Sequence, residues 1–168
     1  MSPIHYFQQL TITNRLCVDN GFIPVFCSGP DQVEGVFQRF RKNKNFVVID
    51  DTTDNNVHYS RPGWFTRQVY TVWVLAAVDF NDSEGRETQL NLCRAIFKQF
   101  LSRMIRDKHD RTCGDALEYL DLTKVYYHEL GRYSFNGATG LYFMLEHDVP
   151  ENLCYDSSEW LDPNDNEL

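Results

Sequence analysis

The sequence has no hydrophobic run long enough to cross a membrane and no common nucleotide-binding motif. Its longest uncharged, mostly apolar run, residues 69–78, is half of the roughly 20 residues that a membrane-spanning helix needs. No charged and then apolar leader opens the chain, so we expect no secretory signal. The patterns GxGxxG, GxxxxGKS/T, GxSxG and HExxH are all absent. These absences favour a soluble protein and remove the commonest local signatures of enzymes.

The sequence also lacks a spacing of cysteines that is typical of a disulfide framework. The five cysteines are an odd number, and no CxxC pair occurs. Reduced thiols in a cytosol are therefore the economical interpretation. Cys93 falls on an apolar helical stripe, which indicates packing. Cys27 lies just before a helix opening at Gly29-Pro30, and it is the best candidate for a reactive thiol.

Basic residues are missing from the C-terminal part of the chain. The sequence has 16 Lys and Arg against 24 Asp and Glu, and the last basic residue is Arg132. Eight acids and no base follow from Glu146 onward, so residues 1–145 are neutral and the C-terminal end carries the whole net charge of −8. This distribution argues against sequence-independent binding of DNA or RNA, which depends on several Lys and Arg contacts to phosphates. Protein partners fit it better.

The hydrophobic pattern predicts one α+β domain over residues 1–150, followed by an acidic extension over residues 151–168. Residues 67–80 are β-branched and aromatic on both faces, which predicts the central strand of the sheet. The clearest helix follows over residues 86–108, with its cap at Asp82 or Ser83. We expect a mainly antiparallel, twisted sheet with this long helix and N-terminal helices packed on it.

The remaining elements are shorter. Ser2-Pro3 opens a helix that runs to Asn20-Gly21. The pattern then predicts an edge strand over 22–27, a second helix over 29–44, a strand over 46–49, a polar loop over 50–62, and strands over 120–135 and 139–149. Asn136-Gly137 between the last two strands is typical of a tight hairpin turn.

An acidic cluster is the best candidate for catalysis. Asp50, Asp51 and Asp54 come at a strand end, and grouped carboxylates can hold Mg²⁺ or Ca²⁺. The alternative interpretation is a small cytosolic metal-dependent hydrolase or nuclease that uses Asp50, Asp51 and Glu84. As a calcium loop, however, the segment has Asn55 where glycine is needed. A solvated loop without metal is the preferred interpretation, so we predict no catalytic residue and no cofactor.

Two segments look like contact surfaces. Arg61, Trp64, Phe65 and Arg67 place two large aromatics and two arginines at the end of the polar loop, and such residues anchor interfaces. The alternative is that Trp64 and Phe65 only begin the packing of the central strand.

The second segment is the acidic extension. Tyr155 and Trp160 are its two aromatic anchors, and its acids complement basic helix surfaces of the neutral body. Between copies this complementarity would order a ring or a stack, whereas the alternative is a solubilising disordered tail.

The order of elements resembles the tail terminator and tail completion proteins of long-tailed bacteriophages. Those are small α+β subunits with a central strand, a long helix after it, a mobile loop and a late hairpin. The corresponding segments here are residues 67–80, 84–108, 50–62 and 120–149. The resemblance covers roughly residues 4–150 and is one of element order and size, without a signature residue.

The resemblance implies a structural, non-enzymatic subunit. It would form a ring, commonly a hexamer, that caps the finished tail tube and joins it to the neck and connector proteins of the head. Such a subunit is located in the virion and assembles in the cytoplasm of the bacterial host. We expect no membrane partner and no sequence-specific nucleic-acid binding. A third interpretation is an interaction adaptor that forms no ring.

Overall fold

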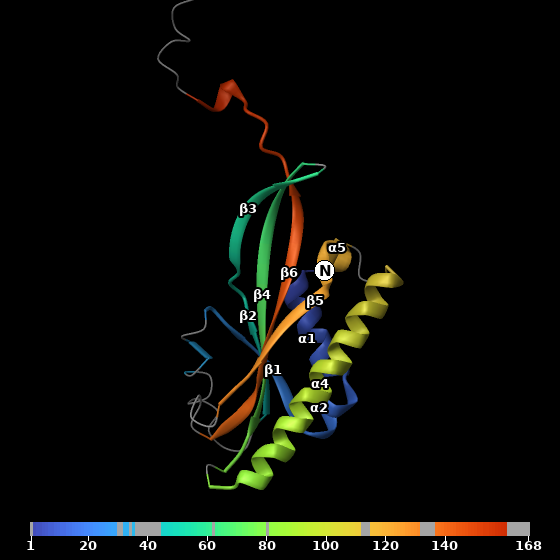
Figure 1. The fold of residues 1–168 in the computed structure, drawn as a ribbon, viewed down its shortest axis with the longest axis vertical. Coiled ribbons are helices and arrows are strands. Elements are labelled where there is room, and N and C mark those ends of the chain that lie inside the picture. Colours follow the sequence, from blue (N-terminus) through green and yellow to red (C-terminus); the bar gives the residue numbers. More distant parts are fainter. Residues whose placement is uncertain are drawn as a thin grey trace, which may run out of the picture.

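The computed structural model describes residues 2–29, 32–33, 35, 45–61, 63–79, 81–111, 115–131 and 137–160. In chain order its elements are α1 (Pro3–Thr13), α2 (Arg15–Asp19), β1 (Phe22–Cys27), β2 (Asn45–Asp50), β3 (Asp54–Ser60), β4 (Gly63–Ala77), α4 (Ser83–His109), α5 (Asp115–Glu118), β5 (Leu120–Glu129), β6 (Ala138–Glu151) and the 3-10 turn η1 (Ser157–Glu159). Together they form a mostly antiparallel six-stranded sheet with helices packed against it, which confirms the predicted α+β class (Figure 1).

β4 lies at the centre of the sheet, as its two apolar faces predict. The strand order is β1-β2-β4-β6-β5, and β3 also pairs with β4. Only the pair of β1 and β2 is parallel. β6 follows one edge of β4 along almost its whole length, from Trp64 opposite Glu151 to Ala77 opposite Ala138. β2 and β3 share the other edge, one after the other.

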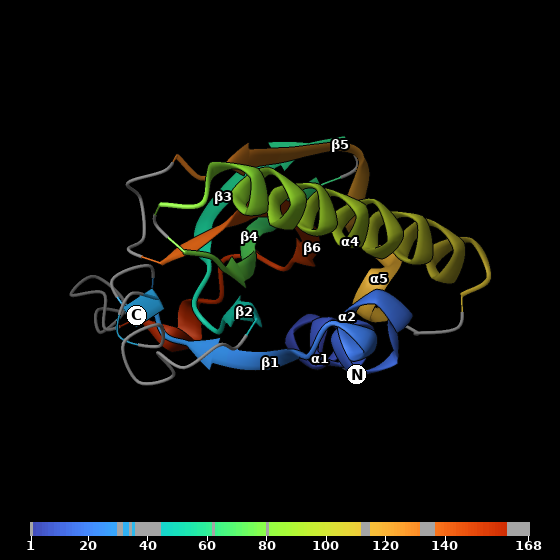
Figure 2. The ribbon, with the colours of Figure 1, turned by 90° about the horizontal axis from the view of Figure 1, so that it is seen from below.

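One side of the sheet, here called the helix face, is covered by α1, α2 and α4 (Figure 2). The ring of Phe97 on α4 lies 5.1 Å from the ring of Phe143 on β6, and the ring of Phe7 on α1 lies 6.2 Å from that of Tyr70 on β4. Each fully buried side chain of this kind stabilises the fold by roughly 1.5–3 kcal/mol. The main hydrophobic core therefore lies between the helices and this face.

The opposite side, here called the open face, is covered only in part. A smaller cluster of buried side chains lies there, made of Cys27, Val33, Phe46, Val48, Trp73, Leu75 and Leu130. Because strand residues alternate between faces, β4 has buried apolar side chains on both sides over residues 72–76, where it contributes to both clusters. The rest of the open face carries no helix among the residues that the structure describes.

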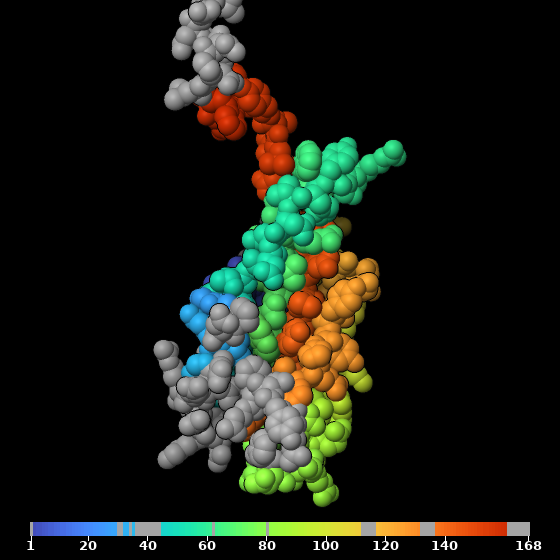
Figure 3. Space-filling model, turned by 60° about the vertical axis from the view of Figure 1, so that its left-hand side comes forward, coloured from blue at the N-terminus to red at the C-terminus, as the bar shows by residue number. Residues whose placement is uncertain are grey.

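Beyond the helices the sheet continues as a narrower arm, consisting of β3 with residues 63–69 of β4 and 146–151 of β6 (Figure 1). In Figure 3 its hairpin end projects from the body of the molecule. The rest of the sheet with its helices is called the body. The predicted loop over residues 50–62 was wrong for Asp54–Ser60, which form β3. Almost all of these residues are exposed, so neither side of β3 needs apolar side chains. The segment therefore lacks the alternation of apolar and polar residues by which a half-buried strand is predicted.

The predicted N-terminal helix is interrupted once, at Asn14. Ser2 caps α1 as expected, and its hydroxyl accepts a hydrogen bond from the backbone N–H of His5. The Asn14 side chain then caps α2 by accepting from the N–H of Cys17, and it donates to Gln99 of α4 at 2.8 Å. Asparagine competes with helical backbone bonds in this way, and here it also ties α1 and α2 to the long helix.

The long helix was predicted correctly, with Asp82 as its cap. The register of the late hairpin was not. A two-residue turn at Asn136-Gly137 places His128 opposite a residue near 145, but His128 pairs with Tyr142. The backbone pairing continues to Leu130, whose N–H donates to the carbonyl of Gly140, and a register shift interrupts β5 between Asp121 and Tyr126.

Two further predictions need a remark. The predicted second helix, over residues 29–44, lies mostly outside the described residues. Within this range, residues 32, 33 and 35 are described and are helical. In the part of the chain that the structure covers, none of the helices combines the length and the apolar character needed to span a membrane.

Candidate interaction surface

The two predicted contact segments meet at one end of the molecule. Trp64, near the hairpin end of the arm, pairs with Glu151, where β6 ends and the C-terminal segment begins. Figure 3 shows that segment leaving the molecule beside the hairpin end. Residues 60–67 and 155–160 are about ninety positions apart in the chain, so only the pairing of β4 with β6 brings them to the same end.

The arm presents large apolar side chains to solvent on its helix-face side. Val57 is 53% exposed, Tyr59 65% and Trp64 45%. The rings of Tyr59 and Trp64 meet edge to face, with centroids 5.4 Å apart. By alternation these residues share the face that carries Tyr70 and Val72 farther along the strand. The arm is thus an uncovered continuation of the face that forms the main core.

The open-face side of the arm is held by ion pairs. Arg67 donates two hydrogen bonds to Asp148, at 2.7 and 2.8 Å, and lies 2.9 Å from Glu146. The hydrogen bond from Arg67 holds the pKa of Asp148 below its usual value. Phe65, half-buried, stacks on His58 with ring centroids 6.0 Å apart. Arg67 therefore braces β4 against β6 within one chain.

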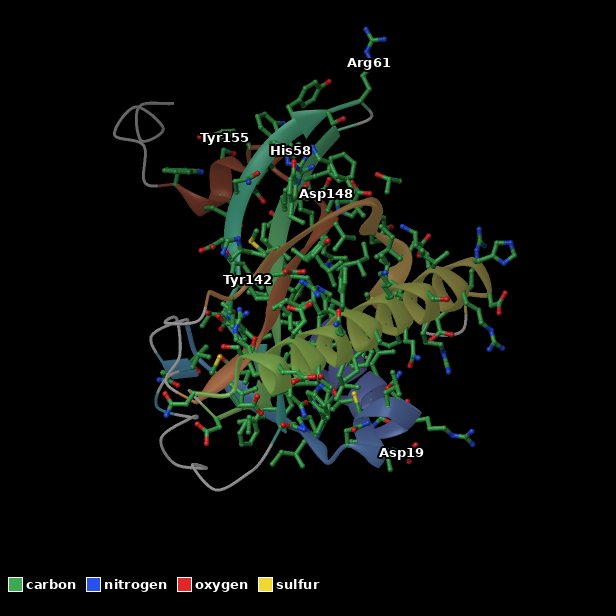
Figure 4. All side chains as sticks on the ribbon, turned by 60° about the horizontal axis from the view of Figure 1, so that its bottom comes forward. Asp19, His58, Arg61, Tyr142, Asp148 and Tyr155 are labelled. Carbon is green, nitrogen blue, oxygen red and sulfur yellow. The ribbon has the colours of Figure 1, made fainter. Side chains whose placement is uncertain are left out.

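Arg61, unlike Arg67, forms no ion pair with the described residues. It is exposed in the turn between β3 and β4, and Figure 4 shows its side chain at the far end of the hairpin, directed away from the body. Among the described residues no acid lies within salt-bridge distance of it, and none donates to or accepts from it. Of the two predicted arginines, Arg61 is the one that remains available for a partner.

The C-terminal segment, defined here as residues 152–160, is exposed throughout. Leu153 is 52% exposed, Tyr155 67% and Trp160 61%. The rings of Tyr155 and Trp160 stack with centroids 6.3 Å apart, across η1, whose first turn Asp156 caps. Exposed apolar patches of this kind on a folded protein indicate a contact surface.

A groove on the open face is a second feature of the molecule, and sequence reasoning missed it. Its volume is about 520 Å³. It is lined by Asp50, Thr52, Asp54, Val69, Thr71, Trp73, His128, Leu130, Tyr142 and Met144. The ring of Tyr142 lies 6.2 Å from Trp73 and 5.5 Å from His128. The lining comes from five strands, β2 to β6, and their neighbouring loops, so its composition depends on the registers between strands.

The acidic cluster contributes one buried member. Asp50 is 4% exposed, and its Oδ1 accepts hydrogen bonds from the N–H of Gly29, the N–H of Thr52 and the Thr52 hydroxyl. Asp51 and Asp54 are exposed. Within the described ranges, no three side chains of His, Cys, Asp or Glu lie close enough together to hold a metal ion. Asp50 thus has a structural role in joining the ends of β1 and β2.

The three buried thiols of the described residues, those of Cys17, Cys27 and Cys93, are in surroundings that suppress reactivity. Burial raises the pKa of Cys27 to about 12, and the charges of Asp50 and Asp51 add to the rise. Burial raises the pKa values of Cys17 and Cys93 to about 12 as well. A nucleophilic cysteine needs the opposite, an electropositive and accessible setting. Cys27 was predicted as the candidate reactive thiol, and its burial does not support that role.

Comparison of the chain with protein-family models, with curated proteins and with solved structures finds no match.

Proposed function

We propose that this chain is a structural subunit of a bacteriophage tail ring, which caps the tail tube and joins it to the neck proteins of the head. The observation that carries the proposal is the convergence of the hairpin end and the C-terminal segment at one end of the sheet, with Tyr59, Trp64, Tyr155 and Trp160 exposed there. Exposed aromatics of this density are typical of protein interfaces rather than of free surfaces.

The order of elements supports the same proposal. A central strand, a long helix after it and a late antiparallel strand pair are the features in which the sequence resembles tail terminator and tail completion proteins. In this proposal the partners are other copies of the chain, in a ring expected to be a hexamer, together with the tail tube protein and the neck proteins. The subunit performs no reaction, and its product is an assembly.

The division of labour within the subunit follows from burial. The body holds its core between the helices and the sheet, so it keeps its shape without a partner. The arm and the C-terminal segment expose six large apolar side chains: Val57, Tyr59, Trp64, Leu153, Tyr155 and Trp160. Their burial against a neighbour or against the tube would supply the affinity, since apolar burial contributes about 25 cal/mol per Å².

The experiment is assembly of the full chain alone and with tail tube protein, followed by light scattering and electron microscopy. The proposal predicts a closed oligomer that binds one end of the tubes and stops their growth. Tyr59→Ser with Trp64→Ser should abolish both effects, whereas Val18→Ser, at an exposed apolar site on α2, should leave them intact.

Two outcomes would contradict the proposal. A chain that stays monomeric and binds one soluble partner would identify an adaptor. Metal-dependent hydrolysis that is lost in Asp50→Asn with unchanged thermal stability would identify the alternative hydrolase or nuclease.

A further inference from the structure

The groove on the open face is lined by a largely buried carboxylate, one oxygen of which accepts no hydrogen bond from the described residues. Asp50 lines the groove and is 4% exposed. All three of its hydrogen bonds are made by Oδ1, and within the described residues no hydrogen bond reaches Oδ2. A buried carboxylate is costly unless its charge is matched by a donor or a cation. The open side of the groove is where such a group would enter.

The remaining lining suits a cationic side chain. Asp54 adds a second, exposed carboxylate to the lining, and none of the described residues that line the groove is a lysine or an arginine. Its floor carries the rings of Trp73 and Tyr142, with His128 next to them. Aromatic rings attract guanidinium and ammonium groups through their electron-rich faces, and carboxylates bind guanidinium with two hydrogen bonds. A planar arginine side chain matches both features at once.

The arm supplies an arginine in the right form. Arg61 stands at the tip of the hairpin and is directed away from its own body (Figure 4). Tyr59 and Trp64, paired edge to face, lie directly beside the turn. A tip of this composition carries one cation and two aromatic rings, which is the complement of a groove with two carboxylates and an aromatic floor.

We infer that the hairpin tip of one copy inserts into the open-face groove of a second copy, where Arg61 pairs with Asp50 and Asp54 of that copy. The contact joins different surfaces of the two copies, so it is head-to-tail. An open series of copies therefore has one free tip at one end and one free groove at the other. Repetition therefore generates a ring or a filament and not a closed dimer. This inference rests on the proposed function, because it names the contact that would close the ring.

The test uses two full-length variants with one defective surface each. Arg61→Glu reverses the charge of the tip, and Asp54→Trp blocks the groove with a bulky, uncharged side chain at an exposed residue. Light scattering should show that each variant alone self-associates at least about tenfold more weakly than the unaltered chain. An equimolar mixture should form a pair of one copy each and nothing larger, because only one intact tip and one intact groove remain in it.

Matched controls separate this contact from a general charge effect. Arg15→Glu changes an exposed arginine on α2, and Asp51→Asn changes an exposed acid that does not line the groove. Both should keep the oligomer of the unaltered chain. Asp50→Asn retains an oxygen for Gly29 and Thr52, so it should weaken association with little change in thermal unfolding.

The outcomes distinguish the inference from the proposed function. An oligomer that keeps its mass in Arg61→Glu and in Asp54→Trp overturns the tip-and-groove contact and leaves the ring role standing. An oligomer that depends on both residues but neither binds nor caps tail tubes supports the contact and overturns the phage role. A chain that is monomeric at every concentration, or a mixture that forms no pair, overturns the inference.

Discussion

Tyr70 and Trp64 lie on the same face of β4, six residues apart, yet Tyr70 is 7% exposed and Trp64 is 45% exposed. The difference is the helix layer. Tyr70 belongs to the core that α1 and α4 complete, whereas Trp64 lies in the arm, where the face continues without helices. The same two strands, β4 and β6, thus carry the core in the body and an exposed apolar surface in the arm. Because the aromatic side chains of the arm remain largely in water, we expect them to contribute little to the stability of the single chain.

The largest expected effect is a cavity in the body. Phe143 is fully buried, so Phe143→Ala should lower the free energy of unfolding by about 3–5 kcal/mol. Trp64→Ala in the arm should change it by less than about 1 kcal/mol, because the side chain is already half in water. Urea denaturation of both variants at low protein concentration checks the pair. Equal losses would show that the arm belongs to the folding unit as much as the body does.

A second comparison uses two glycines of the paired strands. A Cβ at Gly140 of β6 would lie 2.0 Å from the carbonyl oxygen of Val74, in the body, and the backbone there has φ +153. Gly140→Ala should therefore destabilise the fold by about 2–4 kcal/mol. A Cβ at Gly63 in the arm meets nothing within 4 Å, so Gly63→Ala should stay within about 0.5 kcal/mol. Thermal unfolding of the two variants measures the difference, and a stable Gly140→Ala would contradict the close approach of β6 to β4.

The brace of the arm should respond to pH. Arg67 lowers the pKa of Asp148 in the folded chain, so the pair stabilises the arm above the unfolded carboxyl pKa of about 3.9. That stabilisation, about 1 kcal/mol for a partly exposed pair, is lost as pH falls through the lower folded value. Arg67→Gln should abolish this pH dependence of the arm. Amide exchange of residues 146–149 at pH 7 and pH 3 gives the measurement, and identical profiles for the two chains would refute the brace.

The smallest effect concerns the thiols. Cys154 is exposed in the C-terminal segment, whereas Cys17, Cys27 and Cys93 are buried in the body with pKa values raised to about 12. A neutral alkylating reagent at pH 7.5 should label Cys154 first, and the labelled chain should keep its unfolding free energy within about 0.5 kcal/mol. Mass spectrometry of digests locates the label. Early labelling of Cys27 would mean that β1 opens readily.

Much of the body was predictable from local pattern. The two-faced apolar run of β4 predicted the centre of the sheet, and the stripe on α4 with its Asp82 cap predicted the long helix. The arm was less predictable, because β3 is polar and owes its conformation to backbone pairing with β4. At the interruption, the Asn14 side chain caps α2 by a local hydrogen bond from Cys17, and it also donates to Gln99, a tertiary contact that no local pattern contains.

The candidate interaction surface could also be predicted only in part. Trp64, Tyr155 and Trp160 were identifiable as aromatics in polar surroundings, and the structure leaves all three exposed. That they meet at one end follows from the register of β4 with β6, which the composition of neither strand determines. The groove arises from side chains of five strands and their neighbouring loops, so its residues can be identified as one site only once the sheet is assembled.

Hydrogen exchange of the full chain, compared between its assembled and dissociated forms, tests the central claim most directly. The account predicts new protection in the arm, over residues 54–67 and 146–151, and in residues 152–160, with the backbone of α4 unchanged on assembly. Protection gained along α4, around Lys98, Arg103 and Arg106, with the arm and the C-terminal segment unchanged, would contradict it.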